Sequence, residues 1–222
     1  MSGWFDAAYR GTPPWDIGRR QLVVARLERA GEIGHSVLDV GCGTGDNAIY
    51  LARHGHEVLG LDSAPLAVER AQAKSRASRW RGKPRFAVHD ALDLAAIGRS
   101  FDTVIDCGFF HTLSDEERRP LVAGLQAVLE IGGHYFMLCF SEHEPGDSGP
   151  RRIHAWEITD TFREEDGFEV EAIDETFFES RSGHRGARAY LASVKRVKPH
   201  RPRRKTKRAP RFGRRTPGEV EG

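Results

Sequence analysis

The chain has few cysteines and no long apolar run, and each absence excludes a class of protein. Cys42, Cys107 and Cys139 are the only cysteines among 222 residues, and they lie far apart in the sequence. An odd, widely spaced set argues against a disulfide framework and against a zinc site. No stretch of 18 apolar residues occurs, so the sequence predicts no membrane-spanning helix.

The sequence also lacks an export signal and two nucleotide-binding signatures. The first residues, MSGWFDAAYRGTPPWD, contain charges and prolines instead of an apolar signal-peptide core. Together with reduced cysteines, this predicts a cytoplasmic protein. No P-loop Lys-Ser/Thr pair is present, and Asp46 stands where the G-x-G-x-x-G fingerprint requires its last glycine.

A net charge of +2 conceals two parts of opposite sign. Twelve Lys and Arg stand against two Glu between Lys195 and Gly222, a charge of +10, which leaves −8 for residues 1–194. The basic stretch has four prolines and almost no large apolar side chains. It cannot bury enough surface to offset the entropy of ordering, so we predict a disordered tail at residues 197–222.

Short apolar runs alternate with amphipathic segments along the rest of the chain. This alternation indicates βαβ units and a mostly parallel sheet with helices on both faces. The predicted strands are residues 36–40, 57–62, 85–90, 101–106 and 134–140, followed by 168–180 and 187–197, which could pair antiparallel. The predicted helices are residues 21–30, 47–54, 65–80, 115–129 and 156–165, with the glycines at 132–133 ending the fourth.

Polar or glycine-rich sequences follow several of these predicted strands. They include Gly41–Asp46, Asp62, Asp90 and Asp106–His111. Parallel sheets bind ligands beyond the carboxyl ends of their strands, so these positions converge on one predicted binding edge.

The first of these sequences, LDVGCGTGDNA, has the composition of a cofactor loop. Its alternate glycines allow a sharp turn and close approach of a ligand to the backbone. The carboxylates of Asp39 and Asp46 would repel a diphosphate but favour a cofactor with a cationic group. Asp62 is placed to accept hydrogen bonds from ribose hydroxyls and Asp90 from an adenine amino group, although NAD remains an alternative ligand at this point.

The motifs VLDVGCGTG, LGLD, HDALDL and FDTVID resemble the ordered motifs of class I S-adenosylmethionine-dependent methyltransferases, from Val37 to about Phe140. The resemblance implies an enzyme that uses S-adenosyl-L-methionine. It also implies an α/β, Rossmann-like, seven-stranded, mostly parallel sheet, with its last strand antiparallel, over residues 36–196. It assigns cofactor contacts to Asp39, Gly41, Cys42, Gly43, Gly45, Asp62, Ser63, Asp90, Ala91, Asp106, Cys107 and Gly108.

The N-terminal sequence TPPWDIG resembles the TPWD-x-G segment of the thiopurine, thiol and halide methyltransferase group. In that group the segment packs over the cofactor, which implies that residues 1–35 form a lid and a first helix and that Trp15 touches the cofactor. Trp15 could instead cap the edge of the core. Tyr9 could wall the acceptor pocket, although an amphipathic helix explains its presence nearly as well.

The acceptor side is predicted from the sequence DCGFFHTL and from the long polar loop after residue 140. Phe110 and Arg152 are expected to contact the acceptor, although Arg152 could instead form a structural ion pair. His111 has the pKa range of a general base for a phenol or a ring N–H. It could also bond the loop backbone or simply pack, and a thiol or halide acceptor would need no base.

These observations favour methyl transfer to a small molecule: a phenol, an aromatic heterocycle, a thiol or a halide. DCGF stands where many amino-methylating enzymes carry an Asn-Pro-Pro-aromatic signature. The alternative is a methyltransferase or binding protein that acts on nucleic acid through the basic tail, because such a tail would bind any polyanion non-specifically. A cofactor-binding protein without catalysis is the third hypothesis.

Overall fold

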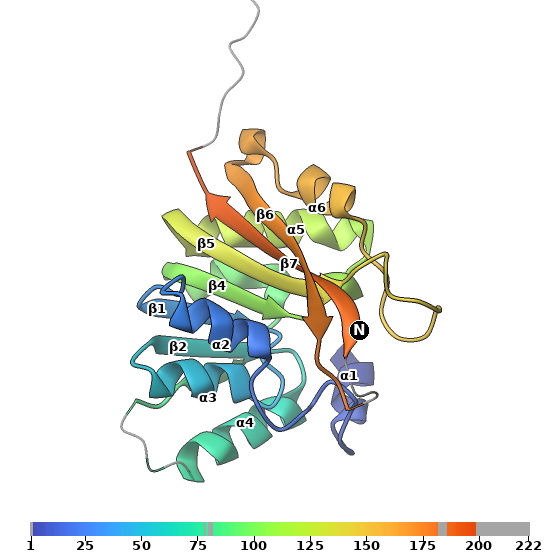
Figure 1. The fold of residues 1–222 in the computed structure, drawn as a ribbon. Helices are drawn as coiled ribbons and strands as arrows, with labels where there is room; N and C mark the ends of the chain where they lie inside the picture. Colours follow the sequence, from blue (N-terminus) through green and yellow to red (C-terminus); the bar gives the residue numbers. More distant parts are fainter. Residues whose placement is uncertain (1, 78, 80–81, 182–185, 199–222) are drawn as a thin grey trace, which may run out of the picture.

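The computed structural model describes residues 2–77, 79, 82–181 and 186–198, and a seven-stranded sheet runs through them (Figure 1). The strand order is β3-β2-β1-β4-β5-β7-β6, and β7 is antiparallel to both of its neighbours. The predicted fold class is therefore confirmed. The strands are β1 (Ser36–Val40), β2 (Glu57–Asp62), β3 (Arg85–Val88), β4 (Phe101–Cys107), β5 (Leu129–Phe140), β6 (Phe168–Phe178) and β7 (Ala187–Arg196).

Helices cover both faces of this sheet (Figure 1). They are α1 (Ser2–Ala8), α2 (Leu22–Arg29), α3 (Asp46–Arg53), α4 (Pro65–Ala77), α5 (Asp115–Val128) and α6 (Ala155–Thr161), with short 3-10 helices η1 (Ala91–Ile97), η2 (Phe110–Thr112) and η3 (Glu164–Asp166). α2 and α3 pack on one face, and η1, α5 and α6 pack on the other. Within the described part of the chain, no helix has the length and apolar character needed to cross a membrane.

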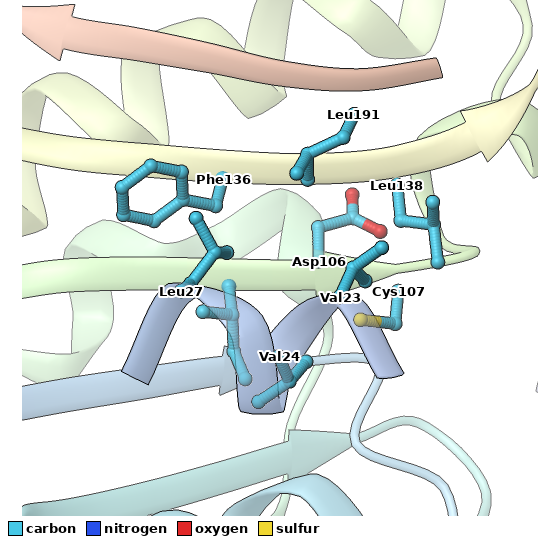
Figure 2. A pocket seen from close by; sticks show the side chains of 9 residues that line it. Val23, Val24, Leu27, Asp106, Cys107, Phe136, Leu138 and Leu191 are labelled. Carbon is cyan, nitrogen blue, oxygen red and sulfur yellow. The ribbon is translucent and has the colours of Figure 1, made fainter. Parts of the chain in front are cut away.

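Helix α2 is fixed against the sheet by one apolar face. Figure 2 shows Val23, Val24 and Leu27 directed at the sheet, where Phe136 of β5 and Leu191 of β7 meet them. All five side chains are buried. Such burial anchors α2 on the sheet. It therefore also fixes the point at which the preceding N-terminal residues enter the helix.

The start of β5 differs from the prediction. The glycines at 132–133 do not end the preceding helix, because α5 stops at Val128 and Leu129 is already extended, with φ −100° and ψ 126°. Gly132 lies inside β5 with φ +91°, and the pairing with β4 shifts register between Phe101 and Thr103. The glycine therefore permits a bulge in the strand. From the sequence alone, a glycine that follows a helix can equally mark the end of that helix or a bulge in the next strand.

The predicted disordered tail, residues 197–222, lies outside the described residues except for Val197 and Lys198. The N-terminal residues 1–35 contain α1 and α2, and β1 follows them at Ser36. The division into lid, core and tail stays a prediction.

Candidate functional site

The turn between β1 and α3 is shaped by glycines in the left-handed region. Gly41, Gly43 and Gly45 have φ angles of +65°, +54° and +82°. A Cβ atom on Gly43 would lie 2.7 Å from the Tyr9 hydroxyl, and one on Gly45 would lie 2.6 Å from the Phe86 ring. Both the backbone conformation and the close neighbours therefore require glycine at these two positions.

Asp62, the last residue of β2, holds this turn in place. One of its carboxylate oxygens accepts a hydrogen bond from the Gly43 amide at 2.8 Å, and the other accepts from the Ala64 amide at 2.8 Å. Burial raises the pKa of Asp62, and these amide donors oppose that shift. The carboxylate thus joins the end of β2 to the middle of the glycine turn.

Asp39 lies beneath the same turn and contains an unsatisfied atom. The residue is buried, and its Oδ2 atom has no hydrogen-bond partner among the residues that the structure describes. Burial, followed by the charge of Asp106, raises the pKa of Asp39 well above its usual value. A buried carboxyl of this kind is stabilised by a cationic or hydrogen-bond-donating ligand.

Residues 12–20, here called the 12–20 segment, reach the glycine turn from the N-terminal side. The Trp15 indole N–H donates to the Tyr9 hydroxyl at 3.0 Å, and the Thr44 hydroxyl donates to Asp16 at 2.9 Å. Tyr9 is buried against Gly43, so it lies at the predicted cofactor turn. The structure therefore brings Trp15 and Tyr9 together beside the glycine turn.

Asp106 organises the turn that follows β4. Its carboxylate accepts hydrogen bonds from the amides of Phe109 at 2.7 Å and Phe110 at 3.0 Å, and from the Tyr135 hydroxyl at 2.7 Å. The residue has no exposed surface, and burial raises its pKa to about 6 against the effect of these donors. The carboxylate is engaged within the chain and shapes the backbone beside the site.

Two adjacent phenylalanines in this turn have opposite placements. Phe110, expected to contact the acceptor, lies wholly buried in the core, 6.0 Å from the Phe162 ring and under the Arg118 guanidinium. Phe109 instead faces the glycine turn, since a Cβ on Gly41 would lie 3.1 Å from the Phe109 Cβ. Phe109 is not among the residues predicted from the sequence, because two identical neighbouring residues carry no signal of which one turns toward a site.

His111 is enclosed by aromatic rings and bonded to the main chain. Its Nδ1 atom accepts a hydrogen bond from the Phe140 amide at 3.0 Å, so the neutral ring carries its proton on Nε2, which lies beside Gly108. The rings of Phe140 and Phe178 lie 5.0 and 5.8 Å away. Burial lowers the pKa of His111 to about 3, so the ring is neutral at physiological pH.

This burial predicts a stability that depends on pH. Because the pKa of His111 falls from 6.5 to about 3 on folding, the unfolded chain binds its proton first as the pH falls. The free energy of unfolding of the wild type should therefore decrease between pH 6.5 and 3, by roughly 1.4 kcal/mol per pH unit more than that of His111→Gln. Asp106 titrates in the same window but is present in both proteins. Urea unfolding at pH 7, 5.5 and 4 measures the difference, and equal slopes would contradict a neutral, buried imidazole.

Arg152, expected to bind an acidic acceptor, is surrounded by its own loop. Its guanidinium lies over the Phe140 ring, 5.5 Å from the ring centre. It donates hydrogen bonds to the main-chain carbonyl groups of Glu144, Pro145, Ser148 and Pro150. These contacts hold the loop after β5 together, and a contact with the acceptor stays a prediction.

The other residues assigned to the cofactor lie along the same sheet edge. The His89 amide donates to the Asp62 carbonyl, which joins the ends of β2 and β3. Beyond this point, Asp90 caps η1 by accepting from the Leu92 amide at 2.9 Å. The others are Ser63, which is half-buried, Ala91, which is buried, Cys42 and Cys107, whose thiol pKa values are raised by burial, and Gly108, with φ +98°.

Comparisons with known proteins agree on one family. Residues 37–133 match the family model described as a methyltransferase domain. The chain is 31% identical over 168 residues to the 2-heptyl-1-hydroxyquinolin-4(1H)-one methyltransferase of Mycobacteroides abscessus, covering 71% of this chain and 74% of that protein. It is also 28% identical over 152 residues to the probable thiol methyltransferase 2 of Arabidopsis thaliana, covering 68% of this chain and 67% of that protein.

One solved structure is similar over nearly the whole fold. It was described for the conversion of a disulfide bond into a thioacetal group during echinomycin biosynthesis. The two chains are 34% identical with a TM-score of 0.79, and the match covers 89% of this chain and 93% of the other.

Proposed function

Because the chain belongs to the class I S-adenosylmethionine-dependent methyltransferases, we propose that it methylates a small molecule whose acceptor atom ionises without a protein base. When bound, S-adenosylmethionine supplies a methyl group on a cationic sulfur. The acceptor atom forms a bond to that methyl carbon while the carbon–sulfur bond breaks, so the attacking atom must carry a free electron pair. The proton on that atom has to leave before or during this step.

The residues at the glycine turn fit this cofactor. The unsatisfied Asp39 oxygen is matched to the cationic amino group of its methionine portion, and the Asp62 carboxylate is matched to ribose hydroxyls. Gly41, Gly43 and Gly45 add no side chains of their own to the turn. We further propose that Trp15, Tyr9 and Phe109 enclose the ligand, since all three contact the turn or one another.

The bonding of His111 is the observation that carries the proposal: Nδ1 accepts from the Phe140 amide and the neutral ring carries its proton on Nε2, so neither nitrogen has a free lone pair. A general base needs a free lone pair and a pKa near the working pH, and His111 has a pKa of about 3. The neighbouring Asp106 carboxylate already accepts three hydrogen bonds from within the chain, and burial raises the pKa of the Tyr9 hydroxyl and of the Cys107 thiol. None of these groups therefore serves as the base, and the free Asp39 oxygen is the one assigned above to the cofactor.

The chemistry of the relatives supports an acidic acceptor. One relative acts on a 1-hydroxyquinolone, in which the hydroxyl is bonded to the ring nitrogen, and another is named a thiol methyltransferase. Both groups ionise more readily than an alcohol. The rings of Phe140, Phe178 and His111 pack together at the carboxyl ends of β5, β6 and β4, which favours a planar, largely apolar acceptor.

A panel of acceptors tests this proposal. With purified protein and labelled cofactor, N-hydroxy heterocycles and aromatic thiols should be methylated, and aliphatic alcohols of the same size should not. For each accepted compound, kcat/KM should rise with pH and level off at the pKa of that compound. A plateau at one pH for all compounds would instead indicate a group of the protein and would overturn the proposal.

His111→Gln gives a second prediction. The substitution keeps a hydrogen-bonding side chain but removes the imidazole, so turnover should fall by less than about tenfold and by the same factor for every acceptor. Loss of a general base typically costs 10²–10⁴-fold. A loss of that size confined to phenols or ring N–H acceptors, measured beside an unaffected thiol, would restore His111 as the catalytic base.

The basic tail and the location of the protein belong to the same proposal. We propose that residues 197–222, with most of the excess of Lys and Arg, contact polyanions non-specifically while the acidic remainder binds the small acceptor. We also propose that the protein works in the cytoplasm, which its three unpaired cysteines support.

A further inference from the structure

The end of β6 is tied to the N-terminal segment by a set of reciprocal hydrogen bonds. The Glu179 carboxylate accepts from the Arg19 guanidinium at 2.8 Å and from the Leu22 amide at 2.7 Å. The main chain of Glu179 donates to the Gln21 side-chain oxygen at 3.0 Å and accepts from the Gln21 side-chain nitrogen at 2.9 Å. Next to these, the Arg181 amide donates to the Pro14 carbonyl at 2.8 Å.

Part of this set lies away from water, although the Arg19 side chain is half exposed. Gln21 is only 5% exposed, and the Glu179 side chain is 15% exposed. Leu22 is the first residue of α2, and the residue before it, Gln21, makes no side-chain cap bond to the helix. The Glu179 carboxylate therefore satisfies an amide in the first turn of α2 that Gln21 does not cap.

The same contacts fix the 12–20 segment at its two sides. Arg181 holds it at Pro14, and Glu179 holds it at Arg19 and also holds Gln21, directly after it. Between these points lie Trp15 and Asp16, which contact Tyr9 and the glycine turn. Phe178, directly before Glu179, packs against His111 and Gly108 on the acceptor side. Phe178, the last residue of β6, thus meets the acceptor side, and Glu179, directly after it, meets the N-terminal segment.

We infer that Glu179 is a positioning residue for cofactor binding: it holds the 12–20 segment over the glycine turn before the cofactor arrives. A segment that is already in its bound position adds less ordering entropy to the cost of binding. The inference rests on cofactor binding at the glycine turn and is independent of the acceptor class proposed above. Glu179 touches no reacting group, so it should affect cofactor affinity and leave the chemical step unchanged.

Glu179→Ala tests this role against a matched control, Asp102→Ala. The Asp102 carboxylate also accepts two hydrogen bonds, from the Ser36 amide at 2.7 Å and its hydroxyl at 2.9 Å, but at the opposite edge of the sheet. Glu179→Ala should weaken S-adenosylhomocysteine binding about tenfold in calorimetry without acceptor, as expected if the segment is in place about a tenth of the time. The KM for the cofactor should rise similarly, with kcat at saturation within about twofold of wild type.

Asp102→Ala should lower the melting temperature to a similar degree but bind the cofactor as the wild type does. Unchanged affinity in Glu179→Ala, or an equal loss in Asp102→Ala, would overturn the inference, because the effect would then be absent or one of general stability. Trypsin gives a second readout, since Glu179→Ala should speed cleavage after Arg19 and Arg20. Glu179→Gln, which keeps the size of the side chain, supports the same measurements if the alanine variant does not fold.

Discussion

Gly43→Val is expected to reduce the affinity for S-adenosylhomocysteine at least about a hundredfold, to the point where calorimetry detects no binding. Its Cβ would lie 2.7 Å from the Tyr9 hydroxyl, closer than two such atoms approach without displacement. The φ angle of +54° is also one that branched side chains avoid. Displacing Tyr9 would release Trp15, which bonds to it, so the substitution disturbs both the turn and the 12–20 segment.

Two further variants separate the causes of this loss. Gly98→Ala carries similar backbone strain, at φ +67°, but its Cβ would meet no atom within 4 Å, so it should destabilise the protein without weakening cofactor binding. Gly43→Ala combined with Tyr9→Phe removes the hydroxyl that the new methyl group would strike. If this double variant binds the cofactor more tightly than Gly43→Ala alone, the loss is assigned to the contact with Tyr9. Tight binding by folded Gly43→Val would refute the geometry of the turn described here.

The parallel part of the sheet is the portion that sequence reasoning predicts best. β1 and β2 have the predicted bounds. Each is a short, mostly buried run, and β1 ends directly before Gly41 while β2 ends at Asp62. The bounds of such strands can be predicted from local composition. The predicted start of β5 is wrong for the opposite reason. Gly132 lies inside the strand, in a bulge that depends on the register with β4. Register is a property of two segments, so one segment cannot reveal it.

The residues of the candidate site also fall into those that local sequence predicts and those that it does not. The glycines and Asp62 are recognisable because their roles depend on backbone conformation and on a position at a strand end. The hydrogen bonds between Gln21 and Glu179 join residues that are 158 positions apart, and neither local sequence predicts this contact. His111 shows a third limit. A histidine after β4 suggests a base, and only its burial and the hydrogen bond from the Phe140 amide to Nδ1 reveal that the ring is held neutral.

Asp62→Ala is the other substitution with a large expected effect. Removing the carboxylate deletes two amide contacts of the turn, to Gly43 and Ala64, together with the proposed acceptor for the ribose hydroxyls. A hydrogen bond to a charged group contributes about 1.5–3 kcal/mol, so cofactor affinity should fall roughly ten- to hundredfold.

Asp62→Asn refines the test of this site, because it keeps the shape of the side chain but places an NH₂ group where one amide now donates. One of the two contacts, to Gly43 or to Ala64, then faces donor to donor, and affinity should fall nearly as far as in Asp62→Ala. Calorimetry with S-adenosylhomocysteine, on variants whose circular dichroism matches the wild type, measures both losses. If Asp62→Asn bound the cofactor normally while Asp62→Ala did not, shape rather than charge would hold the turn. If both bound normally, Asp62 would have no part in the cofactor site.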